Sequence, residues 1–247
     1  MNDVLEGAVC GGDGCSTQDI PSSTGAERAA RQTLSLEVIS DAICPWCWVA
    51  KHRLDRAIAA LGPETAVQVT WRPFELNPDM PKDGLDRRAY RSHKFGSWER
   101  SQALDGQVAE AARSDGLVFR HELIGRTPNT RDAHRLIWLA GREGVQGAVV
   151  EALFSAYFHD GRDVGDRTVL IEVGASAGLD PAMISTMLAS KQGETEVAAE
   201  LQRAHGLNVS GVPTVLVDGR PIFSGAIRFE LMPPITRAQG LPSLVAQ

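Results

Sequence analysis

The sequence predicts an α/β fold in which a block of helices interrupts a single β-sheet domain. Three observations support this prediction. Two strand-like stretches flank a helical stretch early in the chain, the middle repeats apolar residues with helical spacing, and strand patterns return only near the end. With 247 residues, 43% of them hydrophobic, the chain suits one medium domain or a domain with a large insertion.

The first predicted unit is a strand, a helix and a second strand. Residues 34–40 have a strand pattern, and the stretch that follows, running to Leu61, repeats apolar residues at the spacing of one buried helix face. Gly62 and Pro63 are expected to end this helix, because glycine is permissive and proline cannot continue it. Residues 67–71 form the second strand, which a helical crossover predicts to run parallel to the first.

The middle of the chain is predicted to be helical. Mixed charges with spaced apolar residues predict a long helical stretch over 86–115, and apolar stripes predict helices over 131–141 and 150–158. Asp166 and Asp180 are expected to be the N-caps of two further helices. The apolar residues expected to anchor the first of these stretches are Tyr90, Phe95, Trp98, Leu104 and Val108.

The two ends of the chain differ in character. Residues 1–33 are rich in Gly, Ser, Thr and Asp without sustained periodicity, which predicts a disordered tail. Strands are predicted at 214–217 and 220–224, and Asp218-Gly219 between them is typical of a two-residue hairpin turn. A last helix is predicted over 228–239.

Charge and composition argue against several partner classes. The net charge is −6, the pI is near 5.5, and arginines are interleaved with acidic residues, so we expect no nucleic-acid partner. No apolar run approaches the ~20 residues of a membrane-spanning helix, so we expect no membrane partner. The start of the chain lacks the basic and apolar regions of a secretory signal, which predicts a cytoplasmic protein, where a disulfide is more often catalytic than structural.

The main candidate for chemistry is Cys44-Pro45-Trp46-Cys47. Two thiols two residues apart, placed between a strand and a helix, can close a reversible disulfide. A helix N-terminus favours the thiolate of Cys44, which is therefore the predicted nucleophile, and Cys47, one turn further on, is the predicted resolving thiol. Trp46 carries neither a charge nor a strong acceptor, so we expect only moderate oxidising power, and we predict that Trp46 binds substrate together with Val212 and Pro213.

Alternative interpretations of the cysteines stay open. A C-x-x-C pair can be half of a zinc site, with Cys10 and Cys15 as the other half, although the strand-to-helix position favours redox chemistry. Cys10 and Cys15 could also be an auxiliary pair that passes electrons to Cys44 and Cys47, but incidental thiols in a tail are the favoured interpretation. No histidine pair has a metal-ligand spacing, and we predict no metal ligand.

Pro213 is a second, independent candidate. A proline at the mouth of the returning hairpin must lie at a strand edge or follow a cis peptide bond. A cis bond would turn the backbone groups of Val212 outward, where they could pair with an extended peptide or with glutathione beside Cys44. A trans proline that merely starts a strand is the alternative.

These segments together resemble the DsbA family of thioredoxin-fold proteins, and within it the FrnE-like branch. The matching pieces are residues 41–48, 71–78, 128–130 with 133–136, and 211–214, and the similarity extends over roughly residues 34–240. His134, in the third piece, is expected either to line the cleft between domains or to take a core or capping role.

The resemblance implies a thioredoxin-like fold with an inserted all-helical domain. Residues 34–78 and 207–240 would form the discontinuous thioredoxin-like domain, and 79–206 the helical insertion with its connecting helix. Cys44 would be the nucleophile, Cys47 the resolving thiol and Pro213 a cis proline facing them.

The implied activity is that of a cytoplasmic thiol–disulfide oxidoreductase or isomerase. It would need no cofactor and would act on protein or small-molecule disulfides, with glutathione as a candidate co-substrate. The same family contains glutathione-dependent isomerases related to 2-hydroxychromene-2-carboxylate isomerase, which typically lack the paired cysteines. Such an isomerase or transferase, acting on a small aromatic molecule, is the alternative function, and a redox- or zinc-responsive binding protein is the non-enzymatic one.

Overall fold

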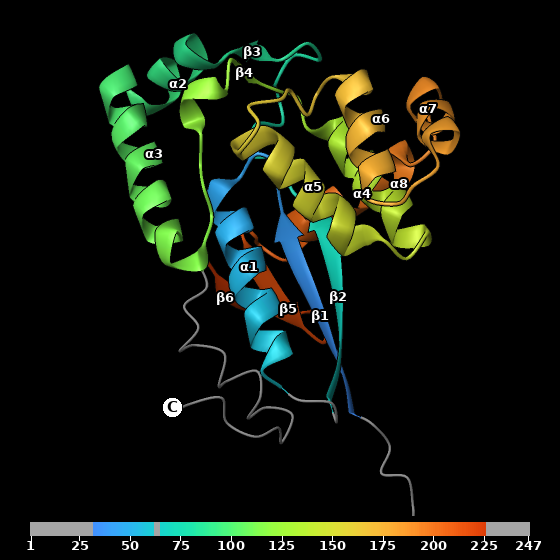
Figure 1. The fold of residues 1–247 in the computed structure, drawn as a ribbon. Coiled ribbons are helices and arrows are strands. Elements are labelled where there is room, and N and C mark those ends of the chain that lie inside the picture. The colour runs from blue at the N-terminus through green and yellow to red at the C-terminus, as the bar shows by residue number, and fades with distance from the viewer. Residues whose placement is uncertain (1–31, 62–64, 226–247) are drawn as a thin grey trace, which may run out of the picture. The chain divides into compact units, whose positions relative to one another are not determined.

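The computed structural model of the chain describes residues 32–61 and 65–225. Cys10, Cys15, the start of the predicted tail and the predicted helix at 228–239 lie outside the described residues. The fold class is confirmed: a sheet carries helices, and most of the helices are inserted between its second and third strands in chain order (Figure 1).

The central sheet has four strands in the order β2-β1-β5-β6 (Figure 1). Strand β1 (Gln32–Ser40) pairs in parallel with β2 (Thr65–Pro73), as the crossover predicts. Strands β5 (Thr214–Val217) and β6 (Arg220–Ser224) form an antiparallel hairpin, and β5 lies antiparallel to β1. The sheet is therefore completed only when the two ends of the described chain meet.

Helix α1 (Pro45–Ala59) connects the two parallel strands. It ends two residues before the predicted Leu61, and its buried face includes the predicted Ala50, Leu54 and Ala57. These side chains belong to the same hydrophobic cluster as apolar residues of β1 and β5. The periodicity of the sequence thus identified the face of α1 that the core covers.

The insertion contains two short strands in addition to its seven helices. Two short strands, β3 (Leu85–Asp86) and β4 (Arg126–Thr127), pair antiparallel within it, so the expectation of an all-helical insertion is corrected in this detail. Two 3₁₀ turns, at Arg113–Asp115 and His121–Leu123, lie before β4. The helices are α2 (Arg87–Phe95), α3 (Trp98–Ala112), α4 (Arg131–Arg142), α5 (Gln146–Phe158), α6 (Arg167–Ser176), α7 (Pro181–Ala189) and α8 (Glu194–Gly206).

The single helical stretch predicted over 86–115 is wrong, because two helices occupy it. Gly96 ends α2 with a left-handed φ of 91°, a conformation that costs glycine little. Ser97 then caps α3 by accepting a hydrogen bond from the backbone N–H of Arg100. The predicted caps Asp166 and Asp180 are confirmed, since each carboxylate accepts backbone N–H bonds from the first turn of α6 and α7 respectively.

The predicted apolar anchors of α2 and α3 are mostly not in the core. Of the five, only Val108 is buried, and the other four are half-buried. The buried residues of these two helices include the polar side chains Arg87, Ser101 and Asp105 instead. Polar groups on this side of the insertion therefore face inward.

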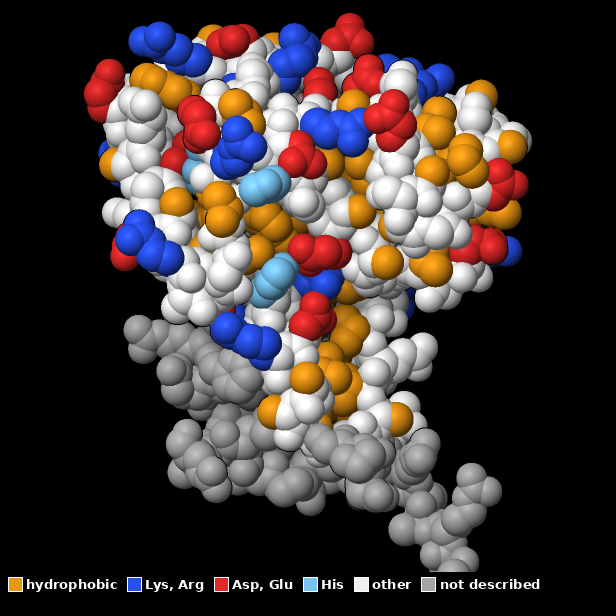
Figure 2. Space-filling view, in the orientation of Figure 1, with side chains coloured by type: hydrophobic (Ala, Val, Ile, Leu, Met, Phe, Trp, Pro, Cys, Tyr) orange, Lys and Arg blue, Asp and Glu red, His pale blue; other side chains and the backbone are white. Residues whose placement is uncertain are grey.

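One hydrophobic cluster joins the sheet, α1 and the insertion. It includes Leu36 of β1, Leu54 of α1, Leu153 of α5 and Ile184 of α7. The division into residues 34–78 with 207–240 and 79–206 stays a prediction. Acidic and basic side chains are interspersed over the face in Figure 2, with hydrophobic ones gathered in its middle. Within the described part of the chain, no helix combines the length and the apolar character needed to cross a membrane.

Candidate active site at the start of α1

Cys44 occupies the junction at which β1 has ended and α1 begins. It is the N-cap residue of α1, and proline follows it at the start of the helix. Its backbone N–H donates to the carbonyl of Asp41 at 3.0 Å, and its own carbonyl accepts from the N–H of Cys47 at 3.0 Å. Both cysteines are free thiols, and Cys44 is 4% exposed whereas Cys47 is fully buried.

The Val212-Pro213 segment lies against this thiol. The peptide bond between the two residues is cis, as one of the two sequence interpretations expected. The Cys44 thiol donates a hydrogen bond to the carbonyl oxygen of Val212, with 3.5 Å between Sγ and O. Two segments separated by most of the chain thus meet at one sulfur atom.

The two sulfurs have different surroundings. Cys44 lines a cavity of about 370 Å³, together with Trp46 and Val212, whereas Cys47 is not among its lining residues. Burial raises the pKa of the Cys47 thiol well above its ordinary value, and a hydrogen bond with Cys44 raises it further. Cys44 is therefore in contact with the cavity, whereas Cys47 is not.

Helices α2 and α3 contribute a charged wall to this cavity. The guanidinium groups of Arg87 and Arg91 share the carboxylate of Asp105, with N–O distances of 2.6 and 2.7 Å to its two oxygens. Arg91 also donates from Nε to the hydroxyl of Ser101 at 2.6 Å. Two cations held by one carboxylate leave this wall with a surplus of positive charge.

A second polar group connects α2 to the loop after β2. Lys94 donates from Nζ to the side-chain oxygen of Asn77 at 2.5 Å and to the carbonyl of Leu76 at 3.3 Å. The hydroxyl of Tyr90 donates to the same oxygen of Asn77. All four residues line the cavity, so these bonds hold the loop and the helix at a set distance across it.

A family model described as "DSBA-like thioredoxin domain" matches residues 35–233. This chain belongs to that family. It is 32% identical to a probable DsbA oxidoreductase from Streptomyces coelicolor, with a TM-score of 0.76 over 87% of this chain and 93% of the other. The uncharacterized protein YwbO of Bacillus subtilis is 26% identical over 195 residues, which are 78% of this chain and 91% of YwbO.

A more distant structural relative is a 2-hydroxychromene-2-carboxylate isomerase. It is 16% identical, with a TM-score of 0.62 over 83% of this chain and 94% of the isomerase, a similarity that shows the fold alone. The resemblance to the DsbA family is confirmed by the family match, and the thioredoxin-like fold with it. The finer assignment to the FrnE-like branch stays a prediction.

Beneath the DsbA-like dithiol lies a buried carboxylate, Asp41. It is fully buried, and its Oδ2 accepts a hydrogen bond from the N–H of Leu76 at 2.7 Å. The ring Nε2 of His134 lies 3.5 Å from the other oxygen of Asp41 and 2.9 Å from the carbonyl oxygen of Phe74. His134 is 2% exposed, as expected for a core residue, and it also lines a cavity between β2 and the helices α4 and α8, so both expectations for it stay predictions.

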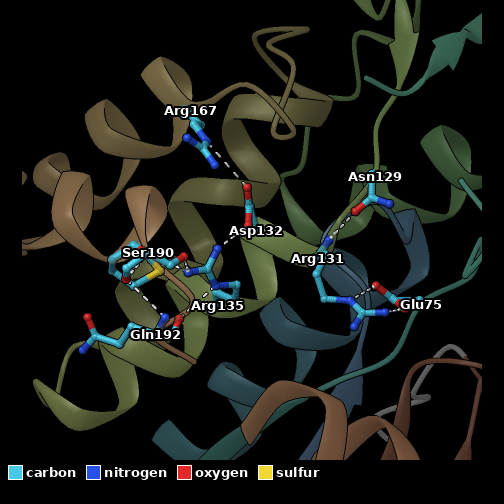
Figure 3. Close-up of polar contacts among 9 residues, drawn as sticks. Glu75, Asn129, Arg131, Asp132, Arg135, Arg167, Ser190 and Gln192 are labelled. Carbon is cyan, nitrogen blue, oxygen red and sulfur yellow. Dashed lines mark hydrogen bonds and ion pairs between the residues drawn. The ribbon is translucent and has the colours of Figure 1, made fainter. Parts of the chain in front are cut away.

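Polar contacts of α4 hold the surrounding scaffold together (Figure 3). Arg131 pairs with Glu75 through two hydrogen bonds of 2.7 and 2.8 Å, and so ties α4 to the residue before Leu76. Figure 3 shows Arg135 reaching from α4 toward Ser190 and Gln192. The buried guanidinium donates to the carbonyls of Met187, Ser190 and Gln192 and to the carboxylate of Asp132.

The charged wall was missed at the level of sequence. Arg87, Arg91 and Lys94 lie at i, i+4 and i+7, which places them on one helix face, but such a charge run is usually solvated. Asp105 and His121 come from later segments, and no local spacing associates them with that face. Within residues 32–61 and 65–225, no three His, Cys, Asp or Glu side chains form a metal-ligand cluster.

Proposed function

We propose that this DsbA-like protein is a cytoplasmic thiol–disulfide oxidoreductase in which Cys44 is the nucleophile and Cys47 the resolving thiol. One observation carries the assignment. Cys44 is the N-cap residue of α1 and lines the cavity next to the Val212 carbonyl, whereas Cys47 is fully buried and does not line it. A thiol at a helix N-terminus is stabilised as the thiolate, which is the attacking species.

The exchange takes two displacement steps. The Cys44 thiolate attacks one sulfur of a substrate disulfide, a new S–S bond forms, and the other sulfur leaves as a thiolate that takes up a proton. Cys47 then loses its proton and attacks the Cys44 sulfur, which closes the Cys44–Cys47 disulfide and releases the second thiol. The substrate gains two electrons and the protein loses two, and the same steps in reverse oxidise a dithiol.

The raised pKa of Cys47 supports the order of these steps. Because burial keeps the Cys47 thiol protonated, the first attack falls to Cys44. The hydrogen bond between the two thiol groups keeps Cys47 next to the sulfur that it must later attack. An isomerase activity would follow from the same pair when the substrate thiol, rather than Cys47, attacks the mixed disulfide.

The test is insulin reduction by wild type, Cys44→Ser and Cys47→Ser proteins in the presence of a thiol reductant. We expect Cys44→Ser to lower the rate to that of reductant alone, because no attacking thiolate remains. Cys47→Ser is expected to accumulate a mixed disulfide on Cys44, detected as an added mass under non-reducing conditions. Insulin reduction by Cys44→Ser at the wild-type rate would exclude the mechanism.

A glutathione-dependent isomerase or transferase is the second candidate. The observation in its favour is the cavity itself, since apolar walls around about 370 Å³ suit a small molecule. Strong retention on immobilised glutathione, together with isomerase turnover that survives Cys44→Ser, would favour it over the redox mechanism. The proposed partners are protein or small-molecule disulfides, with glutathione as co-substrate, and the proposed compartment is the cytoplasm, where the thiols would be kept reduced.

A further inference from the structure

We propose that the cavity beside Cys44 contains a carboxylate-binding subsite, and that its substrate is a small apolar disulfide, aromatic in character, that bears a carboxylate. The inference rests on the proposed function, because it concerns the molecule that Cys44 attacks. Three properties of the cavity support it: a surplus of positive charge, two buried polar atoms without partners among the described residues, and an otherwise largely apolar lining.

The positive charge of the cavity lining exceeds the negative charge of the acidic side chains in the same lining. Arg87, Arg91 and Lys94 line the cavity, and among the described residues that line it Asp105 is the only acid. The side chains of Arg87 and Arg91 are 5% and 19% exposed, so water neutralises them only in part. A buried surplus of this kind is unfavourable until an anion enters, which makes an anionic ligand the complementary one.

Two buried polar atoms in the same cavity lack hydrogen-bond partners among the described residues. They are the hydroxyl oxygen of Thr127, a residue 5% exposed, and the ring Nε2 of His121. Asp105 lies 3.8 Å from that nitrogen, which is too far for a hydrogen bond. An unpaired buried polar group is unfavourable, so a ligand that pairs with both atoms removes this cost.

Both atoms can serve a carboxylate. The Thr127 hydroxyl is a donor, and the His121 ring is a donor in its Nε2–H tautomer. Burial lowers the pKa of His121 to about 4, with Asp105 opposing the effect and Arg87 and Arg91 adding to it, so the ring is neutral at physiological pH. The subsite therefore offers neutral donors in addition to the two guanidinium groups.

The rest of the cavity selects the body of the ligand. Phe95, Leu104, Val108, Ile124 and Phe158 supply an apolar and partly aromatic lining, and Trp46 stands beside Cys44. Glutathione also carries carboxylates, but its two amides and its ammonium group would need partners against this lining. An aromatic or similarly apolar body meets the lining without that cost.

In the reaction, the Cys44 thiolate attacks the sulfur attached to the acidic half of the disulfide. That half stays on Cys44 as the mixed disulfide, and the other half leaves as a thiolate. Cys47 then attacks the Cys44 sulfur and releases the acidic thiol. The disulfide substrate is the oxidant and receives both electrons.

The test compares two aromatic disulfides in their reaction with the reduced protein. One is 5,5′-dithiobis(2-nitrobenzoate), which carries carboxylates, and the other is 4,4′-dithiodipyridine, which is neutral. Stopped-flow absorbance gives a rate constant for each disulfide. The rate constant for the nitrobenzoate, divided by that for dithiodipyridine, is then compared between wild type and each variant, so that the different intrinsic reactivities of the two disulfides cancel. The variants are Thr127→Val, which keeps the shape of the side chain, and His121→Leu.

We expect Thr127→Val to lower the ratio by about tenfold, the effect of one hydrogen bond to a charged group, through a slower reaction with the nitrobenzoate. The rate with dithiodipyridine should stay unchanged, and His121→Leu should act in the same direction. Thr130→Val is the matched control, because Thr130 is equally buried but does not line the cavity. Its ratio should equal that of wild type.

Unchanged ratios in both Thr127→Val and His121→Leu would overturn the carboxylate subsite. The aromatic character of the substrate would be overturned if Thr127→Val lowered the rate constant with oxidised glutathione tenfold but left that with the nitrobenzoate unchanged. Failure of the proposed function gives a different result: dithiodipyridine would then react equally fast with wild type and Cys44→Ser. The inference and the function on which it rests are thus tested separately.

Discussion

At the scale of residues, Cys44 and Cys47 acquire different roles from a small difference in position. Both belong to the same hydrophobic cluster, but Cys44 lines the cavity and Cys47, one helical turn further on, does not. The properties of His121 also depend on its position, because aromatic rings enclose it. The ring of Phe119 stacks on it with 5.2 Å between centroids, and the ring of Phe158 meets it edge-on with 6.1 Å between centroids. Enclosure of this kind decides which form of a titratable group the folded protein holds.

His121 is expected to make stability depend on pH. Its pKa is lowered from 6.5 to about 4 in the folded protein, mainly by burial, so the unfolded chain takes up a proton first as pH falls. The contribution of His121 to stability is fully present above its pKa in the unfolded chain and is lost as pH falls through its pKa in the folded protein. The total loss is at most about 3 kcal/mol. Urea unfolding of wild type and His121→Gln at about pH 7.5 and about pH 4.5 measures this, and wild type should lose more stability than the variant. Equal losses would contradict the prediction.

At the scale of elements, α4 organises the insertion. Its first turn is tied to Glu75 by Arg131, and its middle is tied to the segment between α7 and α8 by Arg135. The carbonyls at Met187 and Ser190 belong to the last turn of α7 and its C-cap, where helices leave acceptors without partners inside the helix. Arg135 donates to both carbonyls from a neighbouring helix, in addition to the Ser190 N–H that bonds to the carbonyl of Met187.

Replacing Arg135 should therefore destabilise the protein strongly. Arg135→Met keeps the length of the side chain but takes one donor away from each of three carbonyls and from the carboxylate of Asp132. We expect the free energy of unfolding to fall by about 3–5 kcal/mol, measured by urea denaturation. Arg142→Met, on the same helix but exposed over the ring of Trp138, is the control and should cost no more than about 1 kcal/mol. Similar losses in the two variants would refute the role given to Arg135.

At the scale of the whole molecule, the sheet and the inserted helices share one core. The cluster that contains Leu36 of β1 also contains Leu153 of α5, and each is 1% exposed. Residues 32–61 and 65–225 all fall within one compact unit of the chain. A core shared in this way couples the unfolding of the two predicted domains.

We expect a single unfolding transition for the described part of the chain. Leu36→Ala and Leu153→Ala should each lower the free energy of unfolding by about 2–5 kcal/mol, and each should shift the same transition. Circular dichroism follows the helices and tryptophan fluorescence follows the buried rings, and the two curves should coincide. Two resolved transitions, with each substitution moving only one, would show that the insertion unfolds independently.

Much of this architecture could be predicted from local patterns. The strand at 34–40, the buried face of α1, the hairpin around Asp218-Gly219 and the cap at Asp166 all depend on residues close together in the sequence. The break at Gly96 was missed because one glycine in a charged stretch does not interrupt its average helical character.

Short-range spacing and residue type were enough to predict the α/β class, the dithiol at Cys44 and Cys47, and the position of Pro213. They did not predict that the Val212 carbonyl lies 3.5 Å from the Cys44 sulfur, or that Arg87 and Arg91 converge on Asp105 inside a cavity, because these contacts arise only when distant segments pack together. The physical reason is that a charged residue on a helix is ordinarily solvated, and burial depends on which distant segment covers it.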